Sequence, residues 1–379
     1  MAARLHVAVT VEQSWQRVPG GTAASTNALL AHLRHDAGLQ LIGIAARHRA
    51  PAPGPWQPPI PVHHIPLPRA ALYRAWHTWR WPPVDMGLWP GSRRPDVIHA
   101  TSPATPPATA PLVATVHDLA FLDEPTWYSP RGAAFLRRGT ELARRHAARV
   151  VVPSAHTREE CLRAGFDPSL LRVIPHGVAV PDVSADAVER WRARSGVTRP
   201  YILWCGTHEP RKNLPALVSA FALLAAGADD PGADLVLVGP PGWGAAAAIP
   251  DRIAQRIHTT GFLPPEDLHA AYAGAAAFCY PSLREGFGMP VLEAMAHGVG
   301  VVTSMGTPMA EVGGDAAVLV DPRDPASIAT GLLRALADPA SYGPAGLARS
   351  REFTWARAAG ELASVYREAA GTSPRSDAT

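Results

Sequence analysis

Glu285-Gly-Phe-Gly-Met-Pro-Val-Leu-Glu293 is the stretch of sequence that decides the fold. An apolar run, Ala275–Tyr280, comes before it and indicates a buried strand. A helix-like run, Val291–His297, comes after it, with Pro290 suited to the first helical position and Gly298 suited to the end. The sequence therefore predicts a strand, a glycine-rich loop and a helix N-terminus in series.

The chemistry of this junction suits a phosphorylated sugar. Free N–H groups and the helix dipole make a helix N-terminus attract phosphate. Gly286 and Gly288 let a ligand approach the backbone closely. The carboxylates of Glu285 and Glu293 are strong acceptors for sugar hydroxyls. We therefore expect the loop to hold such a ligand at the carboxyl end of a strand.

Strand-like and helix-like runs alternate twice along the chain, and the pattern restarts near Val180. This alternation predicts an α/β protein with two doubly wound parallel sheets. In such sheets ligands bind outside the carboxyl ends of the strands. The expected strands are Leu5–Thr10, Leu39–Ala46, Val62–Ile65, Asp96–Thr101, Val113–His117, Val150–Pro153, Tyr201–Cys205, Asp234–Val238, Ala276–Tyr280, Val299–Thr303 and Ala317–Val320; the expected helices include Thr22–His35, Pro130–Ala148, Asn213–Ala226, Pro265–Ala273 and Ala326–Leu336.

Length and composition fit a two-domain protein of the cytoplasm. A chain of 379 residues is long enough for two hydrophobic cores. No apolar stretch has the length of a membrane span, and the N-terminus lacks the layout of a signal peptide. Cys161, Cys205 and Cys279 lie far apart without a CxxC motif, so we expect them to be reduced core residues.

Charge is distributed unevenly. Up to Pro181 the chain has 19 arginines and 11 acidic residues, a net charge of +8, whereas the remainder has a net charge of −5. The basic part indicates an anionic partner or a membrane surface, or else reflects drift in an arginine-rich sequence. Lys212 is the only lysine among 35 basic residues. It is therefore a candidate for a site that needs a compact ammonium group and not a planar guanidinium.

The segment Arg69–Trp81 combines basic and aromatic residues. Tyr73, Trp76 and Trp79 recur every three residues, so they could share one side of a short helix with Arg74 nearby. A helix that includes Trp76–Trp81 could lie at a membrane interface or receive a lipid-linked acceptor. The alternative is a helix packed on its own domain.

Ordered motifs in the second half of the chain resemble one protein family. Gly206-Thr-His-Glu-Pro-Arg-Lys-Asn-Leu214 resembles the phosphate-binding segment of that family, and Glu285 and Glu293 match its E-x7-E signature. Met309-Ala-Glu-Val312 lies where the family has a Pro-Glu-Val-like turn. The chain thus resembles the retaining nucleotide-sugar glycosyltransferases of family 4 (group 1), and among them the mannosyltransferases, which have the GT-B fold.

The resemblance implies two Rossmann-like domains, each a doubly wound parallel sheet, facing across a cleft. Residues 1–178 would form the acceptor-binding domain, and residues 182–354 would bind the nucleotide sugar. A last helix, residues 355–371, would pack back on the first domain, and residues 372–379 would be a disordered tail.

The resemblance also implies roles for the donor-side residues. Arg211 and Lys212 would contact the diphosphate and stabilise the charge of the leaving group, so that no metal is needed. Glu285 would contact the transferred sugar near its 3-hydroxyl, and Glu293 would accept the ribose hydroxyls. The remaining donor-side candidates are Gly286, Phe287, Gly288, Met289, Val291, Gly206, Gly261 and Phe262.

Fewer residues carry the resemblance in the first half. His117 follows an expected strand and would lie beside the transferred sugar; the alternative is a His-Asp pair that only orders a loop. Gly20 and Gly21 resemble the N-terminal glycine loop that faces phosphate and acceptor; the alternative is a plain helix cap. His176 stands where the family usually has asparagine, so no role is carried over to it.

Together these features predict a hexosyltransferase. It would move a hexose, with retention, from a nucleoside diphosphate to a hydroxyl of a glycan or lipid-linked acceptor. GDP-mannose is the favoured donor, while UDP-glucose, UDP-N-acetylglucosamine and UDP-galactose stay open. We expect no cofactor, no metal and no nucleic-acid partner, and we expect peripheral contact with the inner face of the membrane through the N-terminal domain. A non-catalytic sugar-nucleotide-binding protein is the alternative from another class; a phosphorylase would need a Schiff-base lysine, and Lys212 is already assigned to phosphate.

Overall fold

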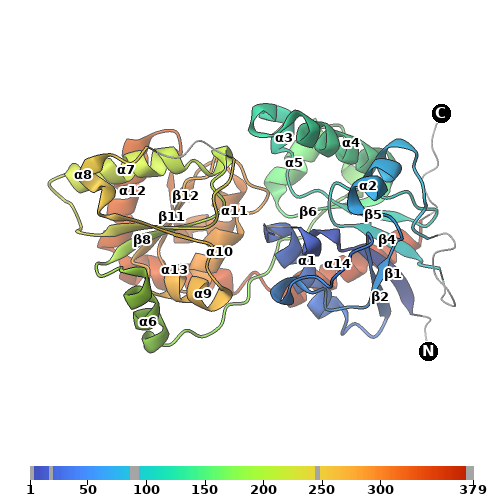
Figure 1. The fold of residues 1–379 in the computed structure, drawn as a ribbon, viewed down its shortest axis with the longest axis horizontal. Coiled ribbons are helices and arrows are strands. Elements are labelled where there is room, and N and C mark those ends of the chain that lie inside the picture. Colours follow the sequence, from blue (N-terminus) through green and yellow to red (C-terminus); the bar gives the residue numbers. More distant parts are fainter. Residues whose placement is uncertain (1–3, 17–19, 86–93, 244–247, 373–379) are drawn as a thin grey trace. The chain divides into compact units, whose positions relative to one another are not determined.

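The computed structural model describes residues 4–16, 20–85, 94–243 and 248–372. The chain forms two compact units, which Figure 1 draws as ribbons. Unit 1 comprises residues 1–177 with 354–379, and unit 2 comprises residues 178–353. Apart from Thr372, the tail that we expected to be disordered lies outside the described residues.

Unit 1 is built on a parallel sheet. In its described part, seven strands lie in the order β3-β2-β1-β4-β5-β6-β7, and all neighbouring pairs run parallel. Figure 1 shows α1 and α14 below this sheet and α2, α4 and α5 above it. The elements are β1 (Leu5–Thr10), α1 (Gly20–Leu33), β2 (Leu39–Ala45), β3 (Val62–His64), α2 (Arg69–Thr78), β4 (Val97–Ala100), β5 (Leu112–Thr115), α3 (Ala120–Asp123), α4 (Pro130–His146), β6 (Ala147–Val152), α5 (Ala155–Arg163), β7 (Leu171–Val173) and α14 (Trp355–Ala370).

Unit 2 has a second parallel sheet. Over its described residues the order is β10-β9-β8-β11-β12-β13, again with parallel pairs only. Figure 1 shows α7 and α12 on one face of the sheet and α9 and α13 on the other. The elements are α6 (Ala185–Ser195), β8 (Tyr201–Cys205), α7 (Leu214–Ala226), β9 (Asp234–Val238), α8 (Asp251–Ala254), β10 (Ile257–Gly261), α9 (Pro265–Ala273), β11 (Ala277–Tyr280), α10 (Met289–Ala296), β12 (Val301–Ser304), α11 (Pro308–Gly313), β13 (Ala317–Val320), α12 (Pro325–Ala337) and α13 (Pro339–Ser350).

Short 3-10 helices connect some of these elements. They are η1 (Glu12–Trp15), η2 (Gly54–Trp56), η3 (Pro125–Trp127), η4 (Pro168–Leu170), η5 (Pro210–Lys212) and η6 (Gly314–Ala316). The one that matters for the site is η5, because it directly follows the carboxyl-end loop of β8.

The inner strands of the unit 2 sheet consist mainly of apolar residues, which are buried. Every residue of β9 and of β11 is buried, as expected for central parallel strands covered by helices on both faces. Polar caps start several of the helices: the Ser129 hydroxyl accepts from Gly132 N at the start of α4, and the Ser154 hydroxyl accepts from Thr157 N at the start of α5.

Three expectations about the elements were wrong. The edge strands β7 and β10 were missed, because the first has only three residues and the second, Ile-His-Thr-Thr-Gly, is largely polar. Helix α4 ends at His146 and not at Ala148, because Ala147 pairs with Leu112 at the start of β6. Trp79 does not share the environment of Trp76: it follows the end of α2 and is 65% exposed, whereas Trp76 is 2% exposed.

The C-terminal helix α14 packs on unit 1. The chain passes so close to its first turn that a Cβ at position 177 would lie 2.1 Å from the Trp355 nitrogen, so only glycine fits there. Tyr366 of α14 is fully buried, and its hydroxyl meets Nδ1 of His99 on β4 at 2.8 Å. Among the described residues, none of the helices combines the length and the apolar character needed to span a membrane.

Candidate active site

The centre of the candidate site is a buried ion cluster in unit 2. Lys212 Nζ lies 2.6 Å from Glu285 Oε1, and Arg211 Nη1 lies 2.6 Å from Glu285 Oε2. The Arg211 Nε also lies 2.6 Å from Glu209 Oε2. Arg211 and Lys212 end η5, and Glu285 lies on the loop after β11. The fold therefore brings Glu285 to two adjacent cations that precede it by more than seventy positions in the sequence.

The backbone holds the two cations in place. Asn213 ends η5 in the left-handed conformation, with φ of 57°, which asparagine tolerates better than most residues. Its side-chain Nδ2 donates to the carbonyls of Pro281 and Pro322, at 3.0 and 2.6 Å. These bonds tie the turn that carries Arg211 and Lys212 to the loop that carries Glu285.

Tyr280 and Ser282 complete the cluster, and sequence reasoning missed both. Lys212 Nζ donates to the Tyr280 hydroxyl and lies 4.9 Å from the centre of its ring. The Tyr280 hydroxyl in turn donates to Glu285 Oε1 at 3.1 Å, and the Ser282 hydroxyl lies 2.8 Å from the same oxygen. Their place at the end of β11, within five residues of Glu285, was the signal that could have identified them. We call these five residues (Arg211, Lys212, Tyr280, Ser282 and Glu285) the Glu285 cluster.

The cluster is ionised. Burial alone would raise the pKa of Glu285, but the charges of Arg211 and Lys212 and the hydrogen bonds from Lys212 and Ser282 lower it to about 2. Burial and the neighbouring Arg211 charge lower the pKa of Lys212, while Glu285 opposes that shift. We regard the Lys212–Glu285 pair as charged, because the carboxylate keeps two cationic partners at 2.6 Å.

The glycine-rich loop ends in a tight approach to helix α11. Gly288 has φ of 107° and precedes α10, and a Cβ there would lie 2.6 Å from Met309 Cγ. Glycine is therefore required by conformation and by space. Gly286 and Phe287 lie between it and Glu285, and the buried Phe287 ring packs edge-on against Phe353.

Two candidates on α10 differ in what they can offer a ligand. Met289 is partly buried at the first position of the helix. Val291 has a fully buried side chain, and its N–H donates to the Gly288 carbonyl at 3.0 Å. The structure thus places Val291 in the core of unit 2, beneath the loop and not on the surface that a ligand would meet.

Glu293 lies one helical turn further on, in a different environment. Its Oε2 accepts a hydrogen bond of 3.0 Å from the hydroxyl of Tyr272, a residue of α9. Unlike Glu285, Glu293 forms no ion pair with any residue that the structure describes. Burial raises the pKa of Glu293 to about 7, and the bond from Tyr272 opposes that rise. Glu293 is half-buried, and a pKa of about 7 leaves its carboxyl group partly ionised near neutral pH.

Glycines stand at the ends of β8, β9 and β10, and Gly239 lies between the other two. Gly206 N donates to the Val238 carbonyl at 2.9 Å, and Gly239 N donates to the Gly261 carbonyl at 2.8 Å. A Cβ at Gly239 would lie 1.9 Å from the Gly206 oxygen. Phe262, next to Gly261, is 65% exposed. Gly206, Gly261 and Phe262 thus share the carboxyl edge of the sheet with the Glu285 cluster.

The candidates in unit 1 come from two elements, the end of β5 and the start of α1. His117 follows β5, and its Nε2 lies 3.0 Å from the Thr101 carbonyl. Because a carbonyl only accepts, this nitrogen carries the proton, and Nδ1 is the basic nitrogen of the ring. Burial lowers the pKa of His117, which favours the neutral ring. Gly20 and Gly21 open α1, Gly20 with φ of 62°, and their neighbours 17–19 lie outside the described residues.

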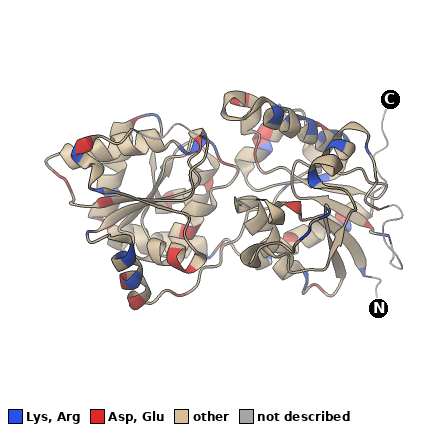
Figure 2. Ribbon diagram, viewed as in Figure 1, with Lys and Arg blue, Asp and Glu red and all other residues tan. Residues whose placement is uncertain are grey.

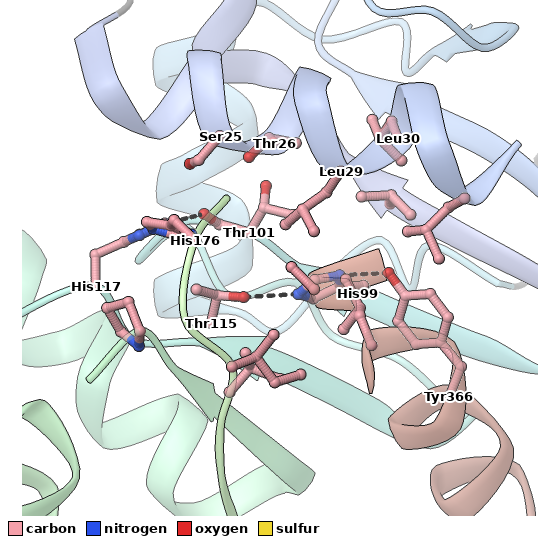
Figure 3. A pocket seen from close by; sticks show the side chains of 17 residues that line it. Ser25, Thr26, Leu29, Leu30, His99, Thr101, Thr115, His117, His176 and Tyr366 are labelled. Atoms are coloured by element: carbon pink, nitrogen blue, oxygen red, sulfur yellow. Dashed lines mark hydrogen bonds between the residues drawn. The ribbon is translucent and has the colours of Figure 1, made fainter. Parts of the chain in front are cut away.

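His117 belongs to a pocket that sequence reasoning did not predict (Figure 3). His176 lies beside it, with ring centres 6.1 Å apart, and His99 bridges the hydroxyls of Thr115 and Tyr366 at 2.8 Å each. Burial lowers the pKa of His99 and of His176 to about 3. We call this the histidine pocket; its cavity of about 30 Å³ has room for a water molecule or two.

No group of three or more histidine, cysteine or acidic residues is placed to hold a metal ion in the part of the chain that the structure describes. Arg211 and Lys212 of the Glu285 cluster place two cationic side chains at the carboxyl edge of the unit 2 sheet.

Comparison with known proteins matches both halves of the chain. A family model described as Glycosyltransferase Family 4 matches residues 19–182, and one described as Glycosyl transferases group 1 matches residues 199–338. The O-antigen chain mannosyltransferase B of Escherichia coli is 30% identical over 269 residues, which cover 67% of this chain and 70% of that protein.

Solved structures share the fold over nearly the whole chain. Sucrose-phosphate synthase from Thermosynechococcus elongatus has a TM-score of 0.73 at 22% identity, over 96% of this chain and 99% of that one. Anabaena Alr3699/HepE in complex with UDP-glucose has a TM-score of 0.71 at 19% identity, over 96% of this chain and 100% of that one. At these identities the likeness shows the fold alone.

Proposed function

Because the chain belongs to the group 1 glycosyltransferases of family 4 and has their GT-B fold, we propose that it transfers a hexose from a nucleoside-diphosphate sugar with retention of configuration. The observation that carries this proposal is the Glu285 cluster, in which two cations and one carboxylate meet at the carboxyl edge of a parallel sheet. That edge is where α/β sheets bind their ligands.

Arg211 and Lys212 are proposed to bind the diphosphate. Two cations beside a departing nucleoside diphosphate stabilise the charge that develops on it, and they are already in position before the reaction begins. Charge-assisted hydrogen bonds contribute about 1.5–3 kcal/mol each. The N-terminus of α10, with Gly286, Phe287, Gly288 and Met289 before or at its start, adds a partial positive charge on the same side.

Glu285 and Glu293 are proposed to hold the two sugars of the donor. Glu285 would accept from a hydroxyl of the transferred hexose, and Glu293 would accept from the ribose hydroxyls. Within the described part of the chain, the hydrogen bond seen at Glu293 comes from the neutral Tyr272 hydroxyl, so its carboxylate has capacity for further donors. Gly206, Gly261 and Phe262 would line the nucleotide side of the same edge.

The proposed reaction is a front-face displacement. The acceptor hydroxyl oxygen forms a bond to the anomeric carbon, and the bond from that carbon to the phosphate oxygen breaks on the same face. The hydroxyl proton passes to the leaving phosphate oxygen, so no protein nucleophile is required. The role of His117 beside the transferred sugar stays a prediction.

Mannose is the proposed hexose and GDP-mannose the proposed donor. The mannosyltransferase relative, at 30% identity over 67% of the chain, supports this choice. The alternative is a glucosyl-, galactosyl- or N-acetylglucosaminyltransferase that uses a UDP-sugar. The acceptor is proposed to be a glycan or a lipid-linked glycan, and the protein is proposed to work in the cytoplasm, in peripheral contact with the inner face of the membrane.

A thermal-shift panel of GDP, UDP and their sugar derivatives tests the donor. A ligand that binds only the folded protein raises its melting temperature, by an amount that increases with concentration and affinity. We expect GDP-mannose to give the largest shift. A larger shift from a UDP-sugar would replace the donor, and no shift from any nucleotide would contradict the proposed function.

Removal of divalent metal tests the role of the two cations. If Arg211 and Lys212 alone neutralise the diphosphate, transfer to a glycan acceptor continues in EDTA at an undiminished rate. A strict requirement for Mg²⁺ would show that the diphosphate needs a metal as well, and the metal-free mechanism would then be wrong.

A further inference from the structure

Helices α2 and α4 of unit 1 carry many arginines, and two exposed tryptophans follow the end of α2. Figure 2 shows basic positions recurring along both helices. We call the following residues the basic tryptophan surface: Arg69, Arg74, Trp79, Arg80 and Trp81 on and after α2, and Arg131, Arg137, Arg138, Arg144 and Arg145 on α4. None of them belongs to the candidate site in unit 2 or lines the histidine pocket.

The two helices are neighbours in space. The His77 and Phe135 rings stack with centres 4.6 Å apart, and Tyr73 stacks on the same Phe135 at 5.6 Å. Arg138 Nε donates to the His77 carbonyl at 3.1 Å. The charges of α4 and the tryptophans that follow α2 are therefore parts of one region.

The tryptophans divide between core and surface. Trp76 is 2% exposed and packs in the core, whereas Trp79 and Trp81 are 65% and 61% exposed. The backbone between the exposed pair is anchored, because Arg80 donates to the carbonyls of Thr105 and Pro106 at 3.2 and 3.4 Å. Two large apolar rings are thus held in solvent by a fixed segment.

Charge in this region is almost entirely positive. Residues 69–81 and 130–146 contain eight arginines and a single acidic residue, Glu141. Arg144 and Arg145 pair with Glu141. Arg131 and Arg137 are exposed, and neither forms an ion pair within the described ranges of the chain. The region therefore has an excess of positive charge available to an anionic partner.

We propose that the basic tryptophan surface binds the surface of an anionic phospholipid bilayer. Tryptophan favours the level of the lipid headgroups, and each basic residue near an anionic leaflet adds attraction. A surface of arginines and aromatic rings can also bind single-stranded nucleic acid, whose bases stack on the rings. Here the Arg74 guanidinium lies over the Trp79 ring at 5.9 Å, which leaves less of that ring for a base. The proposal rests on the peripheral contact proposed above and names the surface that makes it.

Co-sedimentation with vesicles tests the proposal. The full chain is mixed with vesicles of neutral phosphatidylcholine, or of phosphatidylcholine with about one third phosphatidylglycerol, at low and at high salt. We expect binding to the anionic vesicles only, and weaker binding at high salt because ions screen the attraction. Arg131→Gln/Arg137→Gln should weaken partitioning about 25-fold, at about fivefold for each arginine. Trp79→Ser/Trp81→Ser should weaken it about tenfold or more.

Matched controls lie in unit 2. Arg190→Gln/Arg252→Gln removes two exposed arginines, and Trp243→Ser removes a tryptophan that is 60% exposed. Both should bind anionic vesicles as the wild type does, and all variants should keep the wild-type melting temperature. Absence of binding to anionic vesicles, equal binding to neutral ones, or equal loss in the controls would overturn the proposal.

A labelled oligonucleotide completes the test. Binding of the oligonucleotide, lost in the same variants, without binding of vesicles, would assign the surface to nucleic acid and overturn the proposal. The nucleotide-sugar thermal shift is measured on the same samples. It depends on unit 2, so failure of the proposed function and failure of the membrane surface are distinguished.

Discussion

The carboxyl ends of the two parallel sheets differ in their electrostatic environment: one is charged and the other is neutral. In unit 2 the strand ends carry the Glu285 cluster, where ionised groups of opposite charge meet at 2.6 Å. In unit 1 the strand ends carry the histidine pocket, where burial lowers the pKa of His99 and His176 to about 3 and keeps the rings neutral. The same kind of fold therefore presents a charged edge in one unit and a neutral polar edge in the other.

The difference indicates which ligand chemistry each unit suits. A nucleoside diphosphate needs cations, and the desolvation of Arg211 and Lys212 is offset in the free protein by Glu285. A hydroxyl needs only neutral donors and acceptors, which histidine, threonine and tyrosine side chains supply. The ligand chemistry that each edge suits thus depends on a few side chains near the strand ends and not on the sheet itself.

Removal of Lys212 is expected to have the largest effect. Lys212→Ala deletes one of the two cations of the charged edge, so kcat should fall by about two to three orders of magnitude, as for loss of one oxyanion donor. Steady-state kinetics with the donor found in the thermal-shift panel measures the change. Arg252→Ala, an exposed arginine of α8, is the matched control and should keep the wild-type rate. Near-normal turnover of Lys212→Ala would contradict the proposed role of Lys212 at the diphosphate, and with it the contrast between a charged and a neutral edge.

The charged edge was largely predictable from sequence, because most of its residues lie in short motifs that can be recognised locally. The only lysine, the glycines of the loop and the two glutamates lie in short motifs, and β11 before them is a continuous apolar run. Tyr280 and Ser282 were missed because a tyrosine ending an apolar strand and a serine in a loop have many uses, and only their distances to Glu285 reveal one.

The neutral edge was much less predictable. His99, Thr115 and Tyr366 come from three elements, and Tyr366 lies 267 residues after His99, so no local pattern joins them. Trp76 and Trp79 illustrate the same limit, because a spacing of three residues cannot tell that α2 ends between them. Periodicity predicts which residues could be buried, whereas packing decides where a helix stops.

Glu293 extends the comparison, because it belongs to unit 2 but lacks the charged partners of Glu285. It is half-buried, and its hydrogen-bond donor, the Tyr272 hydroxyl, is neutral. Its pKa is raised from 4.5 to about 7 by burial. Binding of ribose hydroxyls needs the carboxylate, so nucleotide affinity should rise with pH through about 7. Glu293→Gln should bind nucleotide about 10–100-fold more weakly at pH 8 and without this pH dependence. Calorimetry at several pH values measures both effects.

The raised pKa of Glu293 has a matching consequence for stability. The folded state holds this proton more tightly than the unfolded state, so the contribution to stability is complete below about pH 4.5 and is lost as pH rises through about 7. Glu293→Gln should therefore be more stable than the wild type at pH 8, by on the order of 2 kcal/mol. An unchanged nucleotide affinity at pH 8 would contradict the ribose role, even if the stability change appeared.

The smallest expected effect belongs to the neutral edge. Tyr366→Phe removes the hydroxyl that meets His99 Nδ1 at 2.8 Å and leaves that nitrogen buried without its partner. The free energy of unfolding should fall by about 1–2 kcal/mol, the cost of one buried unsatisfied group. Nucleotide affinity should not change, because the lost bond lies within unit 1 and involves no ionised group. Tyr342→Phe in unit 2, whose hydroxyl makes no hydrogen bond within the described residues, is the control and should leave both quantities unchanged. If Tyr366→Phe weakened nucleotide binding as strongly as Glu293→Gln does, the two edges would be coupled, and the division of labour between a charged and a neutral edge would be wrong.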